Sequence, residues 1–123
     1  MAASPGSVDT TNILSVCVTD GVVDPALLKE MLGYFIDENH RRMTQAAAAV
    51  ANVDREALRQ IAHAVRGSAA MLAAGYLQHL ATALERDALV GDLDSLTQAV
   101  SAMKTEFIAV LAALRARHPD ACA

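Results

Sequence analysis

The chain has little of what β-rich proteins contain. Aromatic residues make up 3% of its 123 residues, and tryptophan is absent. β-Branched residues are sparse, whereas alanine occurs 26 times. Alanine and leucine favour helices, while strands are enriched in the residue types that are scarce here. The composition therefore predicts an all-α fold, and the length suits one domain with a single core.

The chain also lacks a block of basic residues. Ten Lys and Arg residues are spread along it against 14 Asp and Glu residues, which gives a formal net charge of −4. Proteins that bind nucleic acids concentrate positive charge on one face or in one segment. No nucleic-acid partner is expected.

Cysteine is scarce, with Cys17 and Cys122 near opposite ends of the chain. Two residues so far apart have no metal-type spacing and do not indicate a disulfide framework. They are typical of reduced thiols in a cytoplasmic protein.

A targeting or membrane segment is missing as well. Met1–Val8 carries neither a basic region nor an apolar core. Residues 67–84 hold no Asp, Glu, Lys or Arg, but they include Gly, Ser, Gln, His and Thr. A spanning helix needs about 20 strongly apolar residues. We therefore expect no membrane insertion and a cytoplasmic location, with residues 67–84 in the packed core.

Turn and cap signals divide the chain into four parts. We expect a disordered tail over residues 1–8, and a lead-in segment or short helix over 9–23 with a turn at Asp20-Gly21. A helical bundle should occupy 24–117, followed by a C-terminal tail over 118–123.

Apolar residues recur at steps of three and four over the bundle region, which predicts four helices. The first starts at Asp24-Pro25, a typical N-cap and first position. The expected helices cover 25–51, 55–73, 76–89 and 93–117. Short connections between them predict an antiparallel up-down-up-down four-helix bundle. A polar run over 37–42 interrupts the apolar face of the first helix, so we expect that part to protrude or be partly solvated.

His63 points away from the apolar side of the second helix. That apolar stripe is centred near Leu58 and Val65, and a helix turns by about 100° per residue. His63 is therefore expected to face solvent. Arg59 and Arg66 lie one turn away on the same side, four residues before it and three after.

A glycine lies one turn beyond this histidine. Gly67 costs about 1 kcal/mol relative to alanine inside a helix, and no turn is required there because the apolar pattern continues. The absence of a side chain indicates a steric reason, which is to leave the imidazole open to a large partner. Ala70, one turn further, lies on the same side.

Glu85 is expected opposite His63 on the third helix. The two residues are equidistant from Ala74, in the turn between the second and third helices. In an antiparallel hairpin, equidistant residues lie at the same height. A carboxylate that accepts a hydrogen bond from Nδ1–H leaves the Nε2 lone pair outward, as a nucleophilic histidine requires.

Residues 62–69, with the sequence AHAVRGSA, resemble the signature A-H-x-L-K-G-S-A of the histidine phosphotransfer (HPt) domain family. The likeness extends more weakly over 24–117 and includes Leu77 and the Leu84-Glu85 pair. Three positions depart from the family's pattern: Arg66 stands where Lys is usual, Met71 where Asn is common and Ala73 where Gly is common.

The resemblance implies a phosphorelay intermediate without ATP-binding kinase activity of its own. His63 would accept a phosphoryl group from a receiver-domain phospho-aspartate and pass it to another receiver. Glu85 would orient the imidazole and Arg66 would offset phosphate charge. The partner-binding surface would comprise Arg59, Arg66, Gly67, Ala70 and Met71.

The partners implied are response-regulator receiver domains and a hybrid sensor histidine kinase. The chain would need no cofactor or metal of its own, because Mg²⁺ is expected on the receiver. We expect the protein to be a monomer.

Two alternatives remain open. Asp37-x-x-His40 has the spacing of carboxylate-bridged metal helices, although a second such pair is missing from the sequence. A non-catalytic interaction bundle could dimerise through the long apolar seam of residues 93–117. We favour that seam as the intramolecular core, because rows of paired charges beside it are lacking.

Overall fold

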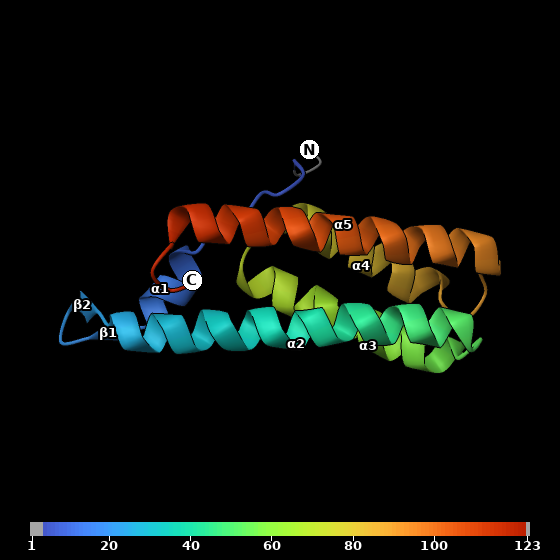
Figure 1. The fold of residues 1–123 in the computed structure, drawn as a ribbon, viewed down its shortest axis with the longest axis horizontal. Helices are drawn as coiled ribbons and strands as arrows, with labels where there is room; N and C mark the ends of the chain where they lie inside the picture. Colours follow the sequence, from blue (N-terminus) through green and yellow to red (C-terminus); the bar gives the residue numbers. More distant parts are fainter. Residues whose placement is uncertain (1–3, 123) are drawn as a thin grey trace.

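The structure is a computed structural model that describes residues 4–122. The chain forms α1 (Thr11–Val16), β1 (Val18–Thr19), β2 (Val22–Val23), α2 (Pro25–Ala51), α3 (Arg55–Met71), α4 (Gly75–Asp87) and α5 (Leu93–Arg117). The long helices α2 and α5 run the length of the molecule, and α3 and α4 lie behind them (Figure 1).

The helices α2 to α5 form the expected bundle. Each packs against the next along the chain, and α5 packs against α2, which closes the bundle. The apolar residues of α5 fill the core, since Val100, Met103, Phe107 and Leu114 are all buried. The all-α helical bundle is thus confirmed, and the seam of residues 93–117 serves the intramolecular core.

Aspartates begin three of the bundle helices, the first of them as the sequence predicted. The Asp24 carboxylate accepts hydrogen bonds from the backbone N–H groups of Ala26 and Leu27. Asp54 and Asp92 accept from the N–H groups of Ala57 and Ser95 in the same way. Each cap satisfies a backbone donor that would otherwise lack a partner at the helix start.

The turn between α3 and α4 differs from the expected boundaries. The expected helix reached Ala73, but α3 ends at Met71 because Ala73 adopts a left-handed conformation, with φ of 47°. The Ala74 N–H then donates to the Ala69 carbonyl at 2.9 Å, which closes the helix end. The next helix begins at Gly75 and ends at Asp87, where the Asp87 carbonyl accepts from Val90 and Gly91.

The polar run over residues 37–42 is partly solvated, as expected, because three of its six residues are exposed. It does not make α2 protrude. Asn39 is completely buried, and its Nδ2 donates to the Phe35 carbonyl at 2.8 Å. Ile36 and Met43 are buried on the same side. The amide satisfies its own helix backbone, so the buried face continues through the run.

The N-terminal segment crosses the bundle rather than hanging free from it. Residues 1–3 of the expected disordered tail lie outside the described part, but Val8 is buried. The Gly6 N–H donates to Glu106 Oε2 at 2.7 Å, and the Asp9 N–H donates to the Leu72 carbonyl at 2.8 Å. These bonds tie the segment to α5 and to the end of α3.

The lead-in segment contains both a short helix and a hairpin. Asp20 and Gly21 have φ values of 53° and 80° and form the turn that the sequence predicted. The strands β1 and β2 that flank it pair antiparallel, with Val18 opposite Val23, and were not predicted. At the other end of the chain, His118 Nε2 lies 2.9 Å from Thr10 Oγ1, which places the C-terminal segment beside α1 (Figure 1).

The left-handed Ala73 predicts that Ala73→Gly stabilises the protein. Relief of the left-handed conformation is worth ~1–2 kcal/mol for a residue with a side chain. Glycine's greater freedom in the unfolded chain cancels ~0.4–1 kcal/mol of that. We expect a net gain of about 0.5–1 kcal/mol in urea denaturation. Ala70→Gly, inside α3, should instead lower the free energy of unfolding by about 1 kcal/mol. A lower free energy of unfolding in both variants would contradict the left-handed conformation of Ala73.

Glu106 predicts a pH-dependent contribution to stability. Burial raises the pKa of this carboxyl, and the hydrogen bond from Gly6 opposes the rise. A carboxyl with a higher pKa in the folded than in the unfolded protein stabilises the fold in acid. That contribution is lost as the pH rises above its ordinary value of 4.5 through the raised pKa.

The comparison variant is Glu106→Gln, which keeps an acceptor for the Gly6 N–H. Relative to this variant, the free energy of unfolding of the wild type should fall as the pH rises across that window. Denaturation series on both proteins measure the difference, in which the other carboxyl groups cancel. A constant difference across the window would show that Glu106 titrates alike in both states.

Candidate functional site

His63 is exposed on the outer face of α3. Its side chain is 60% exposed. The opposite face of the helix is buried in the core and carries Leu58, Ala62, Val65 and Ala69. The periodicity of the apolar residues therefore places the imidazole in solvent, as the sequence indicated.

Glu85 of α4 lies beside the imidazole. Its Oε1 is 2.8 Å from His63 Nδ1, and its side chain is only 17% exposed. A carboxylate oxygen only accepts hydrogen bonds, so this distance requires a proton on Nδ1. The opposite tautomer would set two lone pairs against each other. The neutral imidazole therefore carries its lone pair on Nε2, directed away from Glu85.

Arg66 completes a cluster of three side chains. Its Nη1 lies 3.2 Å from Glu85 Oε2, an oxygen that is shielded from solvent and accepts no hydrogen bond from the described residues. Its Nη2 lies 3.1 Å from His63 Nδ1. Because the proton on Nδ1 is directed at Glu85, that second approach is a contact and not a hydrogen bond. The guanidinium therefore neutralises Glu85 and lies against the imidazole ring.

Arg59 is on the same face as His63 but is paired with Glu56. Its Nε donates to Glu56 Oε2 at 3.0 Å, and its Nη2 bonds Oε1. These hydrogen bonds raise the pKa of the Arg59 guanidinium and lower that of the Glu56 carboxyl. The pairing was not foreseen from the sequence, although the spacing of three residues permits it.

The surface beyond His63 is open and carries small or apolar side chains. A methyl group added at Gly67 would meet nothing within 4 Å. The packing of this chain therefore does not require glycine at that position. Ala70 is exposed and Met71 is 55% exposed. These three exposed residues follow the histidine along α3 and carry no charge.

Ser68 joins α3 to α2 rather than facing the histidine. Its Oγ accepts a hydrogen bond from Arg42 Nη1 at 2.8 Å. Arg42 also lies near Asn39 Oδ1 at 3.4 Å and Glu38 Oε2 at 3.9 Å. No pattern in the sequence indicates this pairing, since 26 residues separate Ser68 from Arg42.

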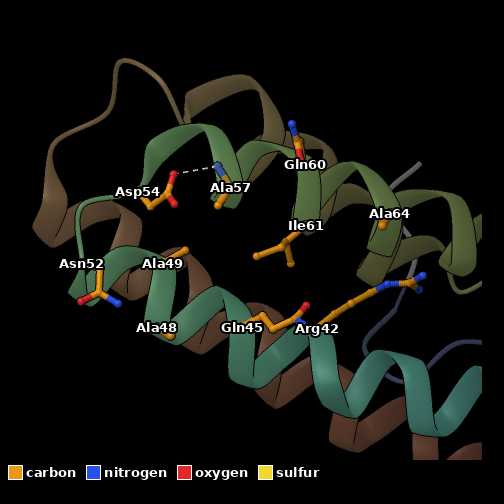
Figure 2. A pocket seen from close by; sticks show the side chains of 10 residues that line it. All are labelled: Arg42, Gln45, Ala48, Ala49, Asn52, Asp54, Ala57, Gln60, Ile61 and Ala64. Carbon is orange, nitrogen blue, oxygen red and sulfur yellow. Dashed lines mark hydrogen bonds between the residues drawn. The ribbon is translucent and has the colours of Figure 1, made fainter.

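An open groove of about 500 Å³ separates α2 from α3 on the flank of the histidine helix. Figure 2 shows Ile61 and Gln45 directed into the space between the helices, with Gln60 turned outward. The groove is lined by Arg42, Gln45, Ala48, Ala49, Asn52, Asp54, Ala57, Gln60, Ile61 and Ala64. His63 is not part of this lining, so the groove is separate from the histidine cluster.

The described residues carry neither a cluster of metal ligands nor a membrane-spanning helix. Residues 4–122 contain no group of three or more His, Cys, Asp or Glu side chains arranged to hold a metal ion. The pair Asp37 and His40 therefore has no further ligands in that part of the chain. No described helix combines the length and apolar character needed to cross a membrane.

Comparison with known proteins identifies one family. The family model described as Hpt domain matches residues 30–117, which is more than half of the chain. The matched region includes α3, α4 and the cluster of His63, Arg66 and Glu85. No curated protein and no solved structure matches the chain.

Proposed function

Since this chain belongs to the family of Hpt domains, which transfer phosphoryl groups through a histidine in phosphorelays, we propose that His63 accepts a phosphoryl group from a receiver domain's phospho-aspartate and passes it to another receiver. The observation that carries the proposal is the Nδ1–H hydrogen bond to Glu85. It leaves Nε2 as an exposed nucleophile.

The transfer step follows from this geometry. The Nε2 lone pair attacks phosphorus in line, the new N–P bond forms, and the acyl P–O bond breaks. The receiver's aspartate leaves as a carboxylate. Catalysis of such a step is mostly positioning and charge neutralisation. The Mg²⁺ that neutralises the transferring group is expected on the receiver, and the chain offers the oriented imidazole.

Arg66 and Glu85 are proposed to act as a unit. Imidazole loses electron density as the N–P bond forms, and the Glu85 carboxylate stabilises the positive charge that develops on the ring. Arg66 keeps Glu85 in its shielded position before transfer. After transfer, its guanidinium is close enough to offset part of the phosphoryl charge.

The partner-binding surface is proposed to surround His63. Arg59 and Arg66 provide charge, while Gly67, Ala70 and Met71 provide a smooth apolar area. Such a combination suits a receiver domain whose active-site carboxylates must approach the imidazole closely. The partners proposed are receiver domains and a hybrid sensor histidine kinase. The monomeric state and cytoplasmic location stay predictions.

The first experiment is phosphotransfer from a phosphorylated receiver domain to the wild type and to His63→Gln. We expect labelled wild type, with the label stable in base and lost in acid, and no label on the variant. His79→Gln is the matched control, because His79 is also an exposed histidine but lies on α4. Label on His63→Gln, or none on the wild type with several active receivers, would rule the proposal out.

Glu85→Ala should slow the transfer about tenfold, because a hydrogen bond to a charged acceptor is worth ~1.5 kcal/mol and 1.36 kcal/mol corresponds to a tenfold rate change. Glu85→Gln retains an acceptor without the charge, so its transfer rate should lie between those of the wild type and Glu85→Ala. Stopped transfer reactions give the rates, and ¹⁵N NMR gives the position of the imidazole proton. An unchanged rate with the proton still on Nδ1 would remove Glu85 from the mechanism.

A further inference from the structure

Glu56 and Arg59 form a two-point ion pair on the approach to His63. Both side chains are partly exposed, at 52% for Glu56 and 37% for Arg59. Arg59 Nε lies 3.0 Å and 3.2 Å from the two carboxylate oxygens, and Nη2 bonds one of them. Gln60 Nε2 also donates to Glu56 Oε1 at 3.3 Å. Bidentate contacts of this kind hold a guanidinium in one orientation.

The pair directs Arg59 away from the imidazole. Arg59 is four residues before His63 and therefore shares its face. Long side chains in a helix lean toward its N-terminus, which is where Glu56 lies. The pKa of Arg59 is raised by hydrogen bonding to Glu56 and, to a smaller degree, by the charge of Glu85. The guanidinium is thus within electrostatic range of the His63 cluster although its hydrogen bonds are made elsewhere.

We propose that Glu56 is a regulatory residue that competes with the phosphoryl group on His63 for Arg59. The inference rests on the proposed function. Before transfer, Arg59 is bound to Glu56, just as Arg66 is bound to Glu85. A phosphoryl group on Nε2 brings nearly two negative charges and three acceptor oxygens. It draws Arg59 toward itself, one helical turn along α3.

Glu56 keeps a partner when Arg59 leaves. Its Oε1 still accepts from Gln60 Nε2, so the carboxylate is not left without a hydrogen bond. The exchange breaks one exposed ion pair and forms another, and pairs of this kind differ by small amounts. The strength of the Glu56 pair therefore tunes how firmly the phosphoryl group is held on His63.

The consequence concerns the balance between keeping and passing on the phosphoryl group. A strong competitor for Arg59 weakens the stabilisation of phosphohistidine and favours onward transfer. Loss of the competitor shifts the balance toward phosphohistidine. Glu56 would thus shift the equilibrium between phosphohistidine and onward transfer without contacting the transferred group.

The test uses phosphoramidate, a small donor that labels histidine without a receiver. The Nε2 lone pair forms the N–P bond while the donor's P–N bond breaks, and ammonia leaves. The full-length wild type, Glu56→Gln, Arg59→Ala and the double variant are labelled in this way. Titration followed by ³¹P NMR then gives the acid dissociation constant of the phosphoryl group.

Release of Arg59 in Glu56→Gln should raise that dissociation constant about two- to fivefold, the range expected of one exposed ion pair. The dissociation constants of Arg59→Ala and of the double variant should agree with each other and should not exceed that of the wild type. Asp94→Asn is the matched control, because it removes one carboxylate from α5, which packs mainly against α2 and α4. It should titrate as the wild type does.

Three results would overturn the inference. The first is a Glu56→Gln protein that titrates as the wild type does. The second is a dissociation constant that rises as much in the double variant as in Glu56→Gln. That result would show that Glu56 repels the phosphoryl group directly, without Arg59. The third is wild type that phosphoramidate does not label, which would count against both proposals. Labelled His63 that passes nothing to any receiver would count against the proposed function alone.

Discussion

The hydrogen bond between His63 and Glu85 is the interaction on which the site depends. It joins α3 to α4 at 2.8 Å and decides which nitrogen carries the proton. It also explains the position of Arg66, whose guanidinium neutralises the shielded Glu85 oxygen. A single carboxylate therefore links helix packing, imidazole tautomer and local charge.

The turn between α3 and α4 determines whether that bond can form. Antiparallel helices bring equidistant residues together only if the connection has a fixed length. Here the left-handed Ala73 stops α3, and α4 starts two residues later at Gly75. The N-terminal segment reinforces the same end, because the Asp9 N–H donates to the Leu72 carbonyl. The geometry of His63 and Glu85 thus depends on a turn about three helical turns away.

The sequence was sufficient for features that follow from regular geometry. Helical periodicity placed His63 on the exposed face, and equal distance from the turn placed Glu85 opposite it. It was not sufficient where one side chain has several possible partners. Arg59 could approach either Glu56 or His63, since both lie one turn away, and the sequence does not decide between them.

Other features were missed because their partners leave no pattern in the sequence. Asn39 is buried against the Phe35 carbonyl, and Glu106 is bonded to the Gly6 N–H. Backbone groups carry no sequence signature, and strands of two residues are too short to alternate.

The paired arginines have one more consequence. The charges of Glu56, Arg59, Arg66 and Glu85 cancel, whereas the phosphoryl group proposed on His63 would add nearly two negative charges to this face. The rates at which charged partners encounter the two states would then differ, by an amount that depends on ionic strength.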